Sequence, residues 1–141
     1  MNNYDLLILD THIWIWWVKQ DHMLAPAIVK LLNESQAALA ISSVSVYEAA
    51  LQIRRGRVEV DLSMNEWLHA ATTEADIEIL PVDAAIATSA AALPPHHGDP
   101  LDRIIIATAI HYDAMLVSVD GQFPHYKDLA GRLTSNNGLI L

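Results

Sequence analysis

The sequence predicts an α/β fold in which a parallel β-sheet is flanked by α-helices on both faces. Short apolar runs of strand length alternate along the chain with segments of helical periodicity. Strands that alternate with helices are joined by right-handed crossovers, which place the helices on both faces of a parallel sheet. The chain has 141 residues and shows no linker or internal repeat, so we expect a single domain over residues 1–141.

Each expected strand is a short apolar run that ends at a polar or turn residue. The run at residues 4–9 ends abruptly at Asp10, as a buried parallel strand does. The other strands are expected at residues 37–41, 77–80 and 115–119. A final apolar stretch could add a short edge strand at residues 138–141.

The helical segments are recognised by their periodicity and by the residues that start and stop them. Pro26 suits the first turn of a helix, and Gly56 suits the residue after the last turn. A loop is expected at residues 96–98, after a pair of prolines. The predicted helices cover residues 12–18, 25–34, 46–55, 63–74, 83–93 and 101–112.

Composition limits the class of protein. Hydrophobic residues make up 52% of the chain, which supports a packed core, and the absence of cysteine excludes disulfides and thiolate metal sites. No apolar stretch approaches the roughly 20 residues that span a bilayer. No basic region precedes the first apolar segment, so we expect a cytoplasmic protein without a membrane partner.

The chain is acidic, with 8 Lys and Arg against 17 Asp and Glu and a formal net charge of −9. This balance counts against binding of nucleic acid, because such binding depends largely on neutralising phosphates. The argument changes if several carboxylates hold divalent cations, since bound cations can be the largest charges in a site. The positions of the acids are therefore more informative than their number.

Five acids are expected at the edge of the sheet where strands end and helices begin. Asp10 and Asp120 each end an apolar strand, and ligands of open α/β sheets bind beyond the carboxyl ends of the strands. Glu48 and Asp102 lie in the first turns of predicted helices, and Asp99 lies just before the second of these helices. Clustered carboxylates suit Mg²⁺, which takes oxygen ligands, and suit cleavage of phosphodiester bonds assisted by such cations.

Each acid also has a structural explanation. Aspartates at strand ends are common in turns and helix caps. Residues 45–48 have the Ser-x-x-Glu pattern of a capping box, as do residues 63–66. In Asp99-Pro100-Leu101-Asp102 the two acids favour a helix N-terminus. The joint position of the set distinguishes a site from separate caps.

Four segments, in order, resemble the motifs of PIN-domain ribonucleases, and they are most similar to the VapC toxins of bacterial toxin–antitoxin pairs. They span nearly the whole chain, and are LDTH at residues 9–12, SVSVYEA at 43–49, GDPLDRIIIATA at 98–109 and LVSVD at 116–120. The resemblance implies one PIN domain that cleaves RNA with Mg²⁺ or Mn²⁺. It also implies a homodimer that a cognate antitoxin neutralises with a peptide inserted near the active site.

The resemblance assigns roles by position. Asp10, Glu48, Asp102 and Asp120 match the catalytic acids, and the implied metal ligands are Asp10, Asp102, Asp120 and, less directly, Asp99. Thr11 and Ser43 lie where hydroxyl groups support the site. Arg103 is a candidate for binding RNA phosphate, and its alternative is a surface ion pair.

Two further features leave alternatives open. Arg54, Arg55 and Arg57 suit a helix C-terminus, and they fit an antitoxin or dimer contact as well as they fit RNA. The tryptophans at residues 14, 16 and 17 indicate a core helix with one face at an interface.

The alternative function is a non-catalytic acidic binding module, such as a receiver-like domain. A receiver needs an acidic neighbour beside Asp10 and a lysine at the position of Asp120, and both are missing.

Overall fold

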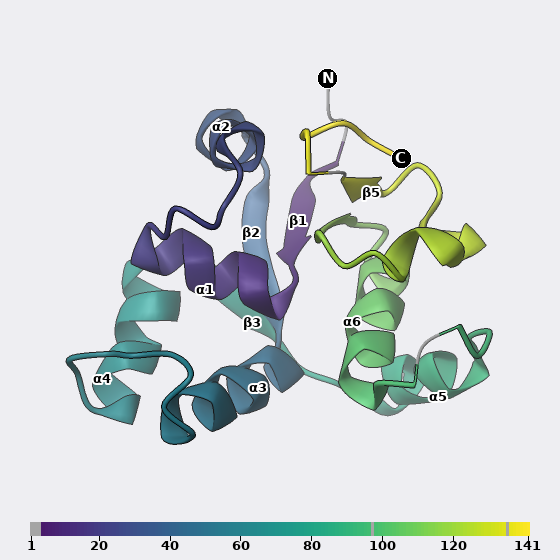
Figure 1. The fold of residues 1–141 in the computed structure, drawn as a ribbon. Coiled ribbons are helices and arrows are strands. Elements are labelled where there is room, and N and C mark those ends of the chain that lie inside the picture. Colours follow the sequence, from purple (N-terminus) through teal and green to yellow (C-terminus); the bar gives the residue numbers. More distant parts are fainter. Residues whose placement is uncertain (1–3, 97, 135) are drawn as a thin grey trace.

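The computed structural model describes residues 4–96, 98–134 and 136–141. Five parallel strands form one sheet in the order β3-β2-β1-β4-β5 (Figure 1). The strands are β1 (Leu6–Leu9), β2 (Ala38–Ser42), β3 (Ile77–Leu80), β4 (Met115–Val117) and β5 (Leu133–Thr134). The helices are α1 (Thr11–Lys19), α2 (Pro26–Glu34), α3 (Ser43–Arg54), α4 (Met64–His69), α5 (Ala84–Ala92) and α6 (Pro100–His111).

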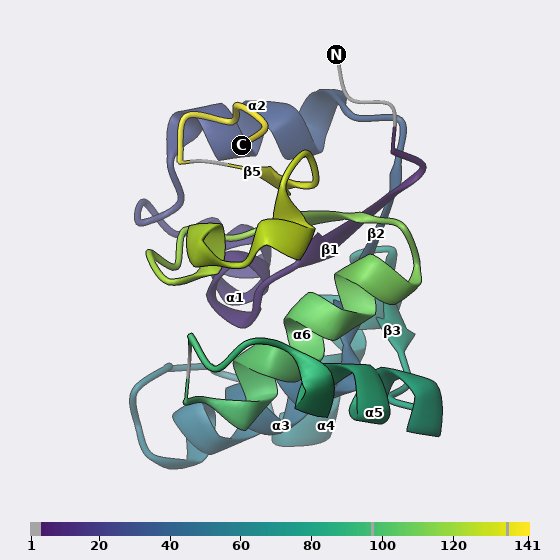
Figure 2. The same ribbon diagram turned by 90° about the vertical axis from the view of Figure 1, so that its right-hand side faces the viewer.

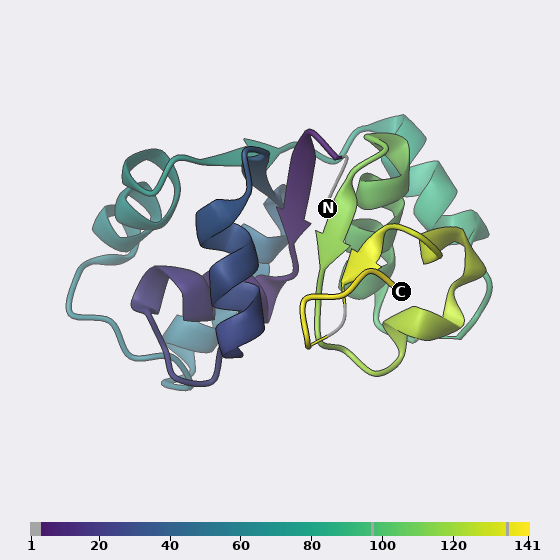
Figure 3. The ribbon, with the colours of Figure 1, turned by 90° about the horizontal axis from the view of Figure 1, so that it is seen from above.

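Helices cover both faces of the sheet, so the expected fold class is confirmed. Leu7 and Leu9 of β1 belong to the core formed with α1, α2 and α4, whereas Ile8 belongs to the core formed with α6. This alternation follows from the two-residue period of a strand. Figure 3 shows the two groups of helices on either side of the strands. α5 packs on α6 through Ile86 and Ala107 (Figure 2).

The direction of chain growth across the sheet reverses at β1. From β1 the chain adds β2 and β3 on one side, and it later returns to add β4 and β5 on the other side. Such a reversal leaves a crevice at the carboxyl ends of the strands. The first residues of α1, α3 and α6 lie near this end of β1 (Figure 1), so the positive ends of three helix dipoles face the same region.

The first four expected strands are present, with ends that shift by up to two residues. The expected edge strand at residues 138–141 is wrong. The edge strand is β5, and residue 140 makes only an isolated antiparallel bridge to Thr134. Two residues are too few to give an alternating pattern, which explains why β5 was not predicted. Of the expected loop at 96–98, residue 97 lies outside the described residues.

The segment after α4 departs from the predicted single helix. Residues Ala70–Glu74 form a π-helical turn in place of further α-helix. Within it, the carbonyl of Ala71 accepts a hydrogen bond of 2.9 Å from the indole Nε1 of Trp14, whose side chain is fully buried. The buried indole thus obtains the partner that a desolvated N–H group needs. Trp16 and Trp17 are half-buried against the same core.

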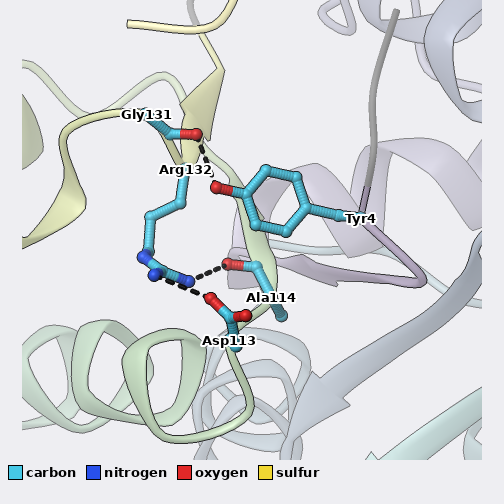
Figure 4. A network of polar contacts seen from close by, with 5 residues as sticks. All are labelled: Tyr4, Asp113, Ala114, Gly131 and Arg132. Atoms are coloured by element: carbon cyan, nitrogen blue, oxygen red, sulfur yellow. Dashed lines mark hydrogen bonds and ion pairs between the residues drawn. The ribbon is translucent and has the colours of Figure 1, made fainter.

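A polar network lies at the amino-terminal end of β1 (Figure 4). It joins the segment before β1 to the segment before β5 and to the turn between α6 and β4. The hydroxyl of Tyr4 donates to the carbonyl of Gly131 at 2.6 Å. The guanidinium of Arg132 donates to the carbonyl of Ala114 at 3.2 Å and pairs with Asp113 at 2.8 Å.

Within the described ranges, no helix is long and apolar enough to cross a membrane.

Candidate active site

Asp10 lies at the carboxyl end of the central strand and is 8% exposed. The residue caps α1, so its position is fixed by the end of β1 and by the first turn of that helix. Its Oδ1 accepts a hydrogen bond from the amide of Thr11 at 2.9 Å, and its Oδ2 accepts one from the hydroxyl of Ser118 at 2.8 Å. Both oxygens of this buried carboxylate therefore have a fixed orientation.

Asp120 follows β4, the neighbour of β1 in the sheet, after a short turn. β4 ends at Val117, earlier than expected, and Ser118 occupies the start of the turn. The hydroxyl of Ser118 accepts a hydrogen bond from the amide of Asp120 at 3.1 Å while it donates to Asp10. The amide of Gln122 donates to Oδ1 of Asp120 at 2.8 Å. One serine hydroxyl thus connects the two strand-end aspartates.

Glu48 is held by the hydroxyl of Thr11, which is held in turn by the hydroxyl of Ser45. The hydroxyl of Thr11 donates to Oε1 of Glu48 at 2.6 Å and lies 2.8 Å from the hydroxyl of Ser45. A threonine hydroxyl carries a single hydrogen, and Glu48 takes it. The Ser45 hydroxyl must therefore donate to Thr11. Thr11 and Ser45 are 2% and 0% exposed, so water does not replace these bonds.

The capping explanation for Glu48 is wrong. α3 begins at Ser43, earlier than predicted, because β2 ends at Ser42 and the hydroxyl of Ser42 accepts the amide of Val44. Ser45 consequently lies inside the helix and cannot form a capping box with Glu48. The same pattern at Ser63 and Glu66 does form a capping box.

The N-terminus of α6 brings the remaining acids to the site. Asp99 is the N-cap, with its Oδ1 accepting the amide of Leu101 at 2.9 Å, and Pro100 begins the helix as expected. Asp102 lies in the first turn. Carboxylate oxygens of Glu48, Asp99 and Asp102 all lie within 4.8 Å of one another. Asp99 is therefore both a helix cap and a member of the cluster.

The electrostatics of Asp102 show that the five acids share one site. Burial raises the pKa of Asp102 from 3.8 to about 8, and repulsion from Asp10, Asp99, Glu48 and Asp120 adds to this effect. Burial also raises the pKa of Asp10 to about 6, although hydrogen bonds from Ser118 and Thr11 oppose the rise. The site therefore concentrates more negative charge than it stabilises by itself.

The donor set fits a hard divalent cation. Its members are carboxylates, the oxygen ligands that suit Mg²⁺ and Mn²⁺. Burial, together with repulsion from neighbouring carboxylates, raises the pKa values of Asp10 and Asp102, and a bound cation would favour the ionised form of both groups. The three acids whose oxygens approach within 4.8 Å combine one residue of α3 with two residues at the start of α6.

Two supporting residues expected from the sequence lie away from these contacts. Ser43 is the first residue of α3, and in the described part of the chain its hydroxyl makes no hydrogen bond with the five acids. The guanidinium of Arg103 donates to the carbonyls of Pro94, Ala90 and Leu93, at 2.8, 2.9 and 2.6 Å. Arg103 thus occupies the C-terminus of α5.

Sequence reasoning missed Ser45 and Ser118, the two serines that orient the acids. The sequence pattern predicts a helix cap for Ser45 and an ordinary strand position for Ser118. Their spacing to an acid, three residues before Glu48 and two before Asp120, was the only available signal. Neither spacing is informative without knowing that Thr11 and Asp10 lie beside these serines.

The fold and the site together define a class: a parallel α/β protein with a carboxylate cluster of metal-binding type at its topological switch point. The sequence matches the family model of the PIN domain over residues 7–129. The chain therefore belongs to the PIN-domain family. It is also similar to Ribonuclease VapC22 of Mycobacterium tuberculosis, with 29% identity over 115 residues that cover 81% of this chain and 86% of that protein.

Solved structures share the fold at lower sequence identity. FitAB bound to an IR36 DNA fragment has a TM-score of 0.66 and 16% identity, over 96% of this chain and 98% of that chain. VapBC2 from Rickettsia felis, bound to a DNA fragment from its promoter, has a TM-score of 0.64 and 20% identity, over 92% and 98%. A toxin–antitoxin complex from Klebsiella pneumoniae has a TM-score of 0.61 and 18% identity, over 94% and 99%.

Proposed function

We propose that this chain is a metal-dependent endoribonuclease that cleaves RNA phosphodiester bonds and acts as the toxin of a toxin–antitoxin pair. One observation carries the proposal: five carboxylates from four separate segments converge at the switch point, where burial and repulsion from the other four raise the pKa of Asp102 to about 8. Structural caps alone would not need to approach one another. Membership of the PIN-domain family and the likeness to Ribonuclease VapC22 support the same activity. We treat residues 1–141 as one PIN domain.

The proposed roles are those that the PIN-domain motifs assign by position, and the contacts add the residues that orient the acids. Asp10, Glu48, Asp102 and Asp120 are the catalytic acids, and Asp10, Asp99, Asp102 and Asp120 would hold Mg²⁺ or Mn²⁺. When bound, the cation supplies Lewis-acid polarisation of the phosphate and an activated water molecule. Thr11 fixes the carboxylate of Glu48 through its hydroxyl, and Ser118 fixes that of Asp10. The N-termini of α1, α3 and α6 add a positive field that favours a phosphate group.

A cleavage assay tests the enzymatic part. The purified chain is incubated with total RNA in Mg²⁺ or Mn²⁺, and the new RNA ends are sequenced. We expect discrete ends that disappear with EDTA and with Asp10→Asn, because that change removes ligand charge without removing core packing. Asp128→Asn, which changes an exposed acid of the turn Lys127–Leu129, is the matched control and should keep full activity. Cleavage at full rate by Asp10→Asn would contradict the site.

The toxin part of the proposal includes two partners, which are a cognate antitoxin and a second copy of this chain. It is supported by fold likeness to VapBC2 and to the Klebsiella pneumoniae toxin–antitoxin complex. We expect induced expression of the chain alone to arrest bacterial growth, and Asp10→Asn to abolish the arrest at equal protein level. Normal growth with high levels of active chain would contradict a toxin role.

A further inference from the structure

We propose that a single strand of RNA lies along the exposed face of α3, with a base stacked on Tyr47 and a phosphate bound by Arg54 and Arg55. This inference rests on the proposed ribonuclease function and assigns the substrate contacts that the acidic cluster cannot supply. A chain of net charge −9 needs its few cations at the substrate path, because phosphate neutralisation dominates binding of nucleic acid.

The structure engages three of the eight basic side chains in other contacts. Arg103 donates to carbonyl groups at the end of α5, Arg132 pairs with Asp113, and Lys19 donates to the carbonyl of Glu59 at 2.9 Å. Within the described residues, the remaining basic side chains make no ion pair with an acid; they are Lys30, Arg54, Arg55, Arg57 and Lys127. Three of these five belong to one turn, around Gly56.

This arginine turn (Arg54, Arg55 and Arg57) ends the helix that carries Glu48. The helix rises 1.5 Å per residue, so Arg54 lies about 9 Å beyond Glu48 along its axis. All three arginines are exposed, and Gly56 allows the left-handed conformation (φ +73°) that ends the helix there. A strand whose scissile phosphate meets the carboxylates can therefore bring a neighbouring phosphate to the guanidinium groups, which suit bidentate phosphate contacts.

The face of α3 between the acids and the arginine turn is formed by Tyr47, Leu51 and Arg54. Their spacing of four and three residues places them on one side of the helix. Ser45 and Ala49 are fully buried on the other side. Tyr47 directly precedes Glu48 and is 58% exposed, so its ring is available to a ligand beside the acids. An exposed aromatic ring beside exposed cations is a combination that binds single strands, because the ring stacks on bases and the cations contact phosphates.

Helix-dipole stabilisation also accounts for cations at the end of α3, but it does not account for Tyr47. The two explanations predict different measurements. A purely structural role leaves RNA affinity unchanged when the arginines are neutralised. A substrate role lowers both the affinity and its dependence on salt.

Fluorescence anisotropy with a labelled single-stranded RNA oligonucleotide tests the proposal. The protein carries Asp102→Asn to prevent cleavage, and binding is measured with Mg²⁺ over a range of KCl concentrations. We expect Arg54→Gln with Arg55→Gln to weaken binding roughly tenfold and to reduce the salt slope by about 0.7, the value for one neutralised phosphate of a single strand. Tyr47→Ala should weaken binding roughly tenfold with the salt slope unchanged.

Lys30→Gln with Lys127→Gln is the matched control, because it removes the same charge from α2 and the turn Lys127–Leu129 and should leave both quantities unchanged. Arginine variants that bind RNA as this control does would overturn the proposal. The proposal is equally overturned if the arginine variants keep RNA binding and lose binding to a protein partner. Failure of the proposed function is detected separately, as absence of metal-dependent cleavage by the unsubstituted chain. If that chain cleaves RNA, the arginine variants should raise KM and leave kcat nearly unchanged.

Discussion

At the scale of single residues, the site depends on hydroxyl groups as much as on acids. Ser118 donates to Asp10 and accepts from the Asp120 amide, so it couples two segments that meet only in the folded chain. Ser45 and Thr11 perform a similar task for Glu48. Partners that orient metal ligands contribute substantially to metal affinity, because they fix the ligand geometry before the cation binds.

Ser118→Ala should weaken Mn²⁺ binding by roughly tenfold, since loss of such a partner costs about 10- to 100-fold in affinity. The Ser118 hydrogen bond lowers the pKa of Asp10, so its removal should also move the acid limb of the activity profile to higher pH. Isothermal titration with Mn²⁺ and a pH–rate series provide the measurements. Ser118→Thr keeps the hydroxyl and should restore both properties. An alanine variant with wild-type Mn²⁺ affinity would show that the contact has no positioning role.

At the scale of elements, Arg103 joins α5 to α6. Its guanidinium satisfies carbonyl groups at the end of α5, which has no glycine cap there and has Leu93, the residue before two prolines, as its C-cap. Arg103→Gln should therefore lower the free energy of unfolding by about 2 kcal/mol, within the range for hydrogen bonds to charged groups. Chemical denaturation checks the change, and cleavage per folded molecule should be maintained. Reduced cleavage with unchanged stability would instead favour an RNA contact.

The elements also show what the sequence can predict. Strands β1 and β4 were predictable because a buried parallel strand is an unbroken apolar run, and these runs end just before Asp10 and Ser118. β3 is shorter in apolar pattern, because Glu78 interrupts it, and its flanking turn residues mark its ends. β5 was not predictable, because it has two residues and its pairing comes from β4. The start of α3 was misplaced because three serines in a row of four residues offer several possible caps, and only the end of β2 selects Ser42.

The acids and the residues that contact them also differ in how far the sequence predicts their roles. The acids could be located from local patterns, since each follows a strand or opens a helix. Ser118 and Arg103 could not, because their roles depend on distant neighbours: Ser118 lies 108 residues from Asp10, and Arg103 reaches back to the carbonyls of α5. Sequence periodicity carries no information on such contacts before the packing of the elements is known.

At the scale of the whole molecule, the cluster makes stability depend on pH. The pKa values of Asp10 and Asp102 are raised from 3.8 to about 6 and about 8. A raised carboxyl pKa favours the folded state at low pH, and this contribution is lost as pH rises through the raised value. We therefore expect the melting temperature in EDTA to increase by roughly 5 °C between pH 8 and pH 5.5. Differential scanning calorimetry measures the change.

Two controls separate this effect from general acid behaviour. Asp102→Asn should flatten the dependence, whereas Asp128→Asn on the exposed turn should leave it unchanged. Mn²⁺ or Mg²⁺ should reverse the trend, since cation binding requires ionised carboxylates and adds more stability at higher pH. A melting temperature in EDTA that falls on acidification from pH 8 would contradict the electrostatic description.

The strand order has a consequence for the time at which the site forms during synthesis. β1 is made first, yet its β4 side stays unpaired until residues 115–117 have been made. Asp10 then still needs Ser118, and Asp102 meets Asp10 only when α6 has packed on the sheet. A chain that emerges in sequence order therefore has no complete site for most of its translation. If the chain is a ribonuclease, the ribosome and messenger that produce it are protected from it until the chain has been made as far as Ser118 and has folded.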